Sequence, residues 1–193
     1  DRHSVEAAGS APPLQSLFAP GRVRAIVREL ATLSSDSGMP DIAAAVQMVA
    51  RAEPIVRLPR QSISSLGHCV QLLFDAGPAM LPFAADQQQF AASAARLLGR
   101  DRVRIADFVH NPLQGVRSQR QVRWEEMRWP GRRSAVIVVS DLGIGSRGVD
   151  AWFQADSWRR FVAEAHRRGL RSVVLIPYAH ERWPAVAAAF GTA

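Results

Sequence analysis

Two stretches of this 193-residue chain each run from aliphatic residues into an aspartate and then into a glycine-containing turn. Gln71–Pro82 reads QLLFDAGPAMLP, and Ala135–Gly145 reads AVIVVSDLGIG. A short, continuous aliphatic run that ends in a turn is typical of a strand buried on both faces, as in a parallel sheet. The carboxyl ends of neighbouring parallel strands share one rim, which is where ligands bind. Asp75 and Asp141 are therefore expected to meet at that rim.

Strand-like and helix-like segments alternate from His68 onward. This order predicts an α/β fold with a mostly parallel, Rossmann-like sheet flanked by helices. A short edge strand is expected at Gln121–Trp124 or Met127–Trp129. The apolar stripe Trp152, Trp158, Phe161 and Val162 is expected to face the core. The main strands are expected at Cys69–Phe74, Val103–Val109, Ala135–Ser140 and Ser172–Ile176, and the helices at Leu81–Leu98, Val149–Arg168 and about Glu181–Phe190.

The first third of the chain has a different composition from the rest. Helical spacing of apolar residues predicts a helix over Gly21–Leu33, and Asp41 is expected to cap a second helix that runs to Arg51. Together they would form a helical hairpin that docks on the main domain or on a partner. The start lacks both a methionine and the layout of a signal peptide, so a processed end or a fragment is expected. The predicted organisation is a flexible lead-in (1–16), a helical hairpin (17–53), an extended connector (54–66) and an α/β domain (67–193).

Every one of the 24 basic residues is arginine, and the chain has no lysine. Chemistries that depend on a lysine amine, such as a Walker phosphate loop, a Schiff base or a Ser–Lys dyad, are therefore excluded. The net charge is +7, but the arginines are scattered along the chain, which leaves nucleic-acid binding a minor alternative. No apolar run reaches the roughly 18 residues of a membrane span. A cytoplasmic location without a membrane partner is the default expectation.

The two aspartate turns resemble those of a von Willebrand factor A (vWA) domain. In that family the first strand ends in an Asp-x-Ser-x-Ser loop, and an Asp after a later strand and a loop threonine complete a divalent-metal site. Asp75 and Met80 match the first loop, and Asp141, between Ser140 and Gly143, matches the later aspartate. The resemblance covers Gly67–Phe190 and implies the family's metal-ion-dependent adhesion site.

The sequence also departs from the family pattern. The two serine positions are Gly77 and Ala79, and the only threonines, Thr32 and Thr192, lie outside the region that would supply the loop threonine. Magnesium prefers about six oxygen ligands. The resemblance therefore implies a degenerate site, in which Asp75, Asp141 and Ser140 hold Mg²⁺ or another divalent cation weakly or not at all. If no cation is held, both aspartates are expected to accept hydrogen bonds from backbone N–H groups in their turns.

A narrower resemblance is to a degenerate vWA-like module of bacteria, carried by Gly67–Gln87, Leu97–Phe108 and the two later strands. This module occurs beside domains similar to the formylglycine-generating enzyme, in gene neighbourhoods proposed to be NTP-dependent conflict systems. The resemblance implies an adaptor in a larger assembly, with any chemistry on a neighbouring domain.

Two functions from different classes follow. The first is a non-enzymatic protein-interaction module that docks a partner through the rim and through the Arg- and Trp-rich loop Arg123–Trp129. The alternative is a metal-dependent hydrolase, such as a nuclease or a phosphatase-like enzyme, that uses Asp75 and Asp141 with Asp86 or Asp156 as helpers. No catalytic residue is assigned and no cofactor beyond a weakly held cation is expected. The candidate partner-binding residues are Gly77, Arg123, Trp124, Arg128, Trp129 and Gly143.

Overall fold

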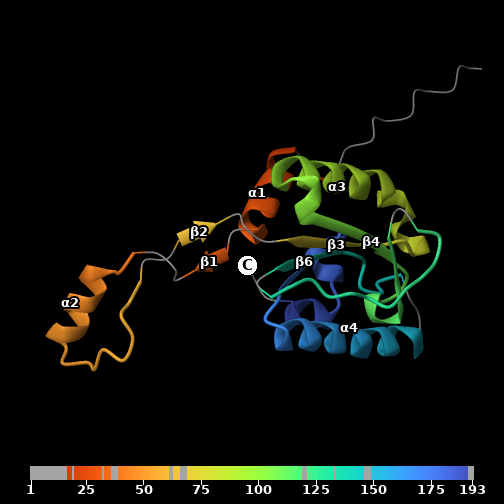
Figure 1. Ribbon diagram of the computed structural model, residues 1–193. Coiled ribbons are helices and arrows are strands. Elements are labelled where there is room, and N and C mark those ends of the chain that lie inside the picture. The colour runs from red at the N-terminus through yellow and green to blue at the C-terminus, as the bar shows by residue number, and fades with distance from the viewer. Residues whose placement is uncertain are drawn as a thin grey trace, which may run out of the picture.

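The protein is an α/β domain with a separate arm near its N-terminus (Figure 1). The domain contains one mostly parallel sheet with helices on both faces, as the alternation of segments predicts. No described helix combines the length and hydrophobicity that crossing a membrane requires. The computed structural model describes residues 17–18, 20–31, 33–35, 39–60, 63–65, 69–118, 121–132, 134–145 and 149–190.

The central sheet has five strands in the order β5-β4-β3-β6-β7. All neighbours are parallel except β5, which pairs antiparallel with β4. From β3 the chain crosses over helix α3 to β4 on one side, whereas from β6 it crosses over helix α4 to β7 on the other. The order therefore reverses between β3 and β6, which makes this junction the topological switch point. The strands are β3 (Val70–Asp75), β4 (Val103–Phe108), β5 (Val116–Ser118), β6 (Ala135–Val139) and β7 (Arg171–Leu175).

Each face of the sheet has its own apolar core. Helices α1 (Pro20–Ala31) and α3 (Ala84–Leu98) cover one face, and α4 (Val149–Arg167) covers the other (Figure 1). Because side chains alternate along a strand, Leu72 of β3 packs under α3 while Leu73 packs under α4. The second core includes Trp158 and Phe161 as expected, whereas the side chain of Trp152 lies outside the described residues.

Several expected elements have different limits in the structure. The edge strand lies at Val116–Ser118, not at either place expected, and Glu125 forms only a single bridge to Val116. Three residues are too few for an alternation of apolar and polar residues to stand out. The helix expected from Leu81 begins as the 3-10 helix η1 (Pro78–Phe83), which contains Pro82. The last helix is two 3-10 turns separated by Pro184, because proline interrupts helical hydrogen bonding: η4 (His180–Arg182) and η5 (Ala185–Ala189).

The two N-terminal helices do not pack side by side. Helix α1 docks on α3 through the buried side chains of Val23 and Val27. Helix α2 (Ile42–Ala50) lies at the far end of a ribbon formed by β1 (Leu33–Ser35) and β2 (Ile63–Ser65), well away from α1 (Figure 1). The segment expected to be a plain connector therefore contains β2. Together, the described residues 33–35, 39–60 and 63–65 form an arm that projects from the domain.

The arm is ordered by local hydrogen bonds. The Asp41 carboxylate accepts the Ala44 N–H at 3.0 Å, so Asp41 caps α2 as its position in the sequence predicts. The Asp41 N–H donates to the Pro59 carbonyl at 2.8 Å and ties the start of α2 to the returning chain. No residue of α2 is buried. Nothing described in the domain therefore covers this helix.

Candidate functional site at the switch point

The two aspartates meet at the switch point, as expected from the strand ends. Asp75 is the last residue of β3, and Ser140 and Asp141 directly follow β6. Ser140 Oγ donates to Asp75 Oδ2 at 2.7 Å and so joins the ends of the two strands. Ser140 is fully buried, and Asp75 and Asp141 are only 4% and 5% exposed. The rim is therefore closed by its own side chains.

Each of the four carboxylate oxygens accepts a hydrogen bond from the chain itself. Asp75 Oδ1 accepts the Gly77 N–H at 2.8 Å, while its Oδ2 accepts from Ser140. Asp141 Oδ1 and Oδ2 accept the N–H groups of Gly143 and Gly145, both at 2.9 Å. These side chains close the turns that follow the strands, which is a common role for aspartate.

The two positions at which the vWA resemblance expects serines are tightly packed. A Cβ on Gly77 would lie 2.9 Å from Asp75 Oδ1, because the carboxylate folds back over this residue. A Cβ on Gly145 would lie 2.8 Å from the Ala79 Cβ, so the second loop packs directly against position 79. The space that ligand oxygens would occupy is therefore filled by the turns.

The residues at the rim do not fit a magnesium site. The hydroxyl proton of Ser140 is directed to Asp75, and its oxygen accepts the Leu142 N–H at 3.0 Å. Mg²⁺ requires about six oxygens in near-octahedral order. Within the described residues, no group of three or more His, Cys, Asp or Glu side chains could hold a metal ion.

Burial raises the pKa of the Asp75 carboxyl above its ordinary value of 3.8. The hydrogen bonds from Ser140 and the Gly77 amide act in the opposite direction and lower the pKa, because they stabilise the carboxylate. The neighbouring Asp141 raises it further, whereas His110 lowers it. The net direction shows that removing the charge from water outweighs the hydrogen bonds that the carboxylate receives.

The helper aspartates of the hydrolase alternative are engaged elsewhere. Asp86 Oδ1 accepts the Leu17 N–H at 2.8 Å and so anchors the segment before α1. Asp156 pairs with Arg160 at 2.7 Å, one turn further along α4. Neither side chain adds a ligand to the rim.

The Arg- and Trp-rich loop does not form one continuous patch. Trp129 stacks on Phe161, with ring centroids 5.2 Å apart, and joins the core under α4. Trp124 remains 43% exposed and lies under the Arg117 guanidinium, 5.1 Å from its ring centroid. Arg123 and Arg128 are exposed. Among the arginines and tryptophans of this loop, the exposed ones are therefore Arg123, Trp124 and Arg128.

Gln154 is a residue at the rim that the sequence does not single out. It reaches from α4 to the loop after β6, where a Cβ on Gly143 would lie 2.6 Å from its Oε1. Its Nε2 lies 3.2 Å from His110 Nδ1 in the loop after β4. The only sequence signal that could have pointed to Gln154 is its position as a polar residue near the start of an amphipathic helix. Gln154 thus contacts His110 in one rim loop and packs closely against Gly143, whose φ is 87°, in the other.

Comparisons with family models, curated protein sequences and solved structures find no match.

The packing around Gly77 generates a stability prediction. We expect Gly77→Ala to lower the free energy of unfolding by about 1–3 kcal/mol, because the added Cβ displaces the Asp75 carboxylate from its turn. Gly131→Ala is the control, since nothing lies within 4 Å of its Cβ position. We expect the control to stay within about 0.5 kcal/mol of wild type in urea denaturation. Equal stabilities for the two variants would contradict the closed turn.

The raised pKa of Asp75 generates a pH prediction. Between 3.8 and the raised pKa the folded state holds the proton more tightly than the unfolded state, so this group's contribution to stability falls as the pH rises. Asp75→Asn has no titrating carboxyl at this position, so it lacks this pH-dependent contribution to stability. Relative to this variant, wild type should therefore gain stability as the pH is lowered towards 3.8, as measured by urea denaturation. A difference that is independent of pH, or that moves the other way, contradicts the prediction.

Proposed function

We propose that this chain is a non-enzymatic protein-interaction module that docks a partner protein through its arm. The observation that carries the proposal is the exposed apolar surface of the arm. Seven large apolar side chains, between 41% and 91% exposed, lie within 20 consecutive positions (39–58). Exposed apolar side chains concentrated in one segment indicate an interaction site. They are Met39, Ile42, Val46, Val49, Ile55, Val56 and Leu58.

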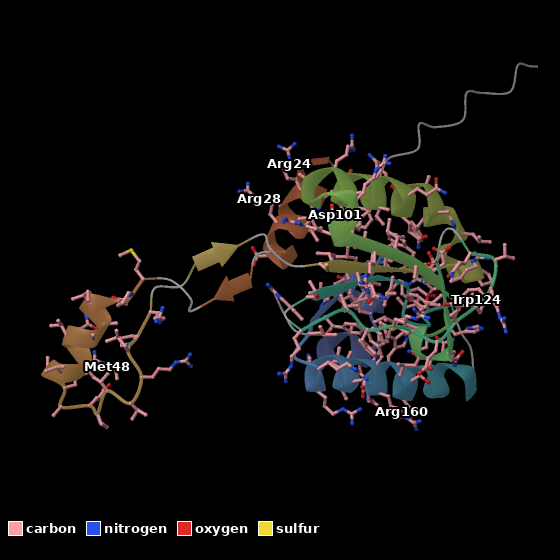
Figure 2. All side chains as sticks on the ribbon, in the orientation of Figure 1. Arg24, Arg28, Met48, Asp101, Trp124 and Arg160 are labelled. Carbon is pink, nitrogen blue, oxygen red and sulfur yellow. The ribbon has the colours of Figure 1, made fainter. Side chains whose placement is uncertain are left out.

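The geometry of α2 supports this function. The helix has nine residues, and isolated helices shorter than about 12–15 residues are marginal in water. Ile42, Val46 and Val49 follow one another at helical spacing, so they share a face. Figure 2 shows the side chains of α2 standing clear of the domain. A partner that covers this face would supply the tertiary packing that the domain does not.

The closed rim supports an adaptor over a hydrolase. Metal-dependent hydrolysis requires carboxylates that converge on an ion with open coordination positions. Here the carboxylates of Asp75 and Asp141 close their own turns. We include in the proposal that the rim is a degenerate form of the vWA metal site. The proposal extends to a role in a larger bacterial assembly, such as a conflict system with a formylglycine-generating-enzyme-like neighbour.

Introducing charge on the apolar face of α2 tests the proposal. We expect Val46→Glu combined with Val49→Glu to abolish partner capture by the immobilised chain, because buried carboxylates would oppose docking. Captured proteins from the source cells are quantified by mass spectrometry for wild type and variant. Val122→Glu, at a position that is 93% exposed and outside the arm, is the control and should capture like wild type. Partners retained by the double variant would contradict docking through α2.

A further inference from the structure

We propose that the open edge of β4 binds an extended acidic segment of a partner protein, which adds a strand to the sheet beside Val103–Ile105. The inference rests on the proposed function, that the chain binds proteins, and it names a second site and the chemistry of its ligand.

Within the described residues, the first half of β4 has a sheet neighbour on one side only. β3 pairs with the whole of β4, whereas β5 pairs with Ala106–Phe108 alone. The Gln121 N–H donates to the Ser118 carbonyl at 2.9 Å, so the chain turns directly after β5 and returns to pair Glu125 with Val116. Among the described residues, none pairs with Val103–Ile105 on the outer side. Such an edge accepts an added strand.

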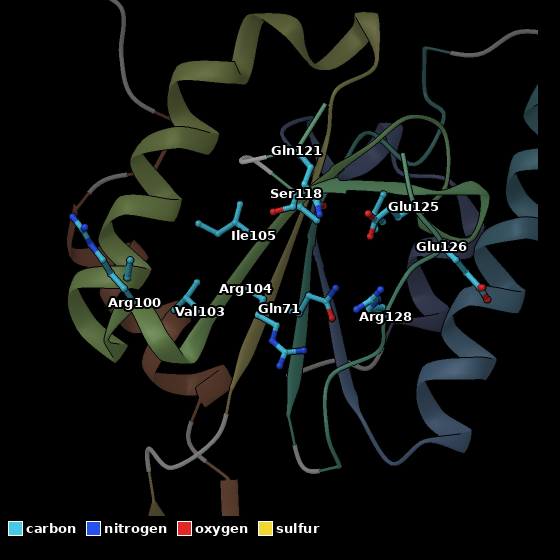
Figure 3. Close-up of a pocket in the computed structure, with 13 residues that line it drawn as sticks. Gln71, Arg100, Val103, Arg104, Ile105, Ser118, Gln121, Glu125, Glu126 and Arg128 are labelled. Atoms are coloured by element: carbon cyan, nitrogen blue, oxygen red, sulfur yellow. The ribbon is translucent and has the colours of Figure 1, made fainter. Parts of the chain in front are cut away.

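A cavity of about 630 Å³ follows this edge (Figure 3). Four consecutive residues, Val103–Ala106, line it, although their side chains alternate between the two faces of the sheet. A cavity lined from both faces reaches around the strand's edge, and Gln71 of β3 shows that it also extends over one face of the sheet. Ala95 of α3 borders it on one face, and Glu125 and Arg128 border it on the other. The edge is therefore accessible and flanked by side chains on both faces.

The cavity lining includes an unpaired polar atom. Gln71 of β3 lines the cavity, lies opposite Arg104 in the sheet register and is 5% exposed. Its Oε1 is buried and finds no hydrogen-bond partner among the residues that the structure describes. A buried acceptor without a donor costs free energy. A ligand that brings a hydrogen-bond donor, such as an N–H group, to this oxygen is therefore favoured over a purely apolar one.

The charges around the edge select an acidic ligand. Arg100, Arg104 and Arg128 line the cavity, and none of the three pairs with a carboxylate in the part of the chain that the structure describes. Figure 3 shows Gln71 between Arg104 and Arg128, with Glu125 and Glu126 on the same side of the cavity as Arg128. Guanidinium groups bind carboxylates in a bidentate manner. Acidic side chains of an added strand would meet these arginines.

The strand edge favours a protein ligand over a nucleic acid. An unpaired strand recognises main-chain N–H and C=O groups at the spacing of another strand. A nucleic acid would bind the arginines through phosphates but would leave the edge unpaired. Binding of a peptide at the edge would therefore depend on the peptide's own main-chain amides, whereas binding of a nucleic acid would not.

Labelled synthetic peptides added to the full chain test the proposal by fluorescence anisotropy. A peptide of alternating valine and glutamate should bind, and Arg104→Glu should weaken binding by about tenfold or more. Arg24→Glu, on the exposed side of α1, is the control and should bind like wild type. N-methylation of alternate amides, placed on either edge in turn, should abolish binding for one of the two edges. A matched valine–lysine peptide should not bind.

Three results would overturn the edge site. They are no binding of the valine–glutamate peptide, equal binding of both N-methylated peptides, and binding of labelled oligothymidylate that is lost in Arg104→Glu while the peptide does not bind. The last would define a polyanion site. If the arm still captures a partner, a negative peptide result removes the edge site alone. Failure of both experiments removes the proposed function as well.

Discussion

The hydrogen bond from Ser140 Oγ to Asp75 Oδ2 is the interaction on which the rim depends. It joins β3 and β6 where the chain diverges to the two sides of the sheet, the place at which α/β proteins usually open a crevice for ligands. Both groups are buried, so losing Ser140 would leave Asp75 Oδ2 without its donor, and losing Asp75 would leave the Ser140 hydroxyl proton without its acceptor, in a medium of low dielectric constant. Because this bond fixes both loops, each aspartate closes its own turn and the crevice does not open.

Because the rim is closed, surface that a ligand could reach has to lie on other parts of the molecule. The two surfaces through which we propose that partners bind are the apolar arm and the edge of β4 with its arginines. They suit different chemistries, since the arm offers apolar area and the edge offers main-chain groups and guanidinium side chains. Arginine remains charged at any physiological pH and binds carboxylates with fixed geometry. A chain whose 24 basic residues are all arginine is well equipped for such contacts.

The sheet and the position of the aspartates could be predicted from the sequence, because aliphatic runs of strand length that end in a turn are typical of buried parallel strands. The closure of the rim could not. Gly77 showed that an oxygen ligand is missing, but only the structure shows that the Asp75 carboxylate fills the space. The arm could not be predicted from the sequence either. Its strands have three residues each, and the apolar spacing of α2 predicts packing that the domain does not provide.

The most direct test of this account is a calorimetric titration of Mg²⁺, Mn²⁺ and Ca²⁺ into wild type and Asp75→Ala. If the chain's own hydrogen bonds satisfy both aspartates, neither protein should bind any of the three ions at concentrations on the order of millimolar. Binding to wild type that is abolished by Asp75→Ala would contradict the account. It would show that the rim opens to form a metal site and would return the hydrolase to consideration.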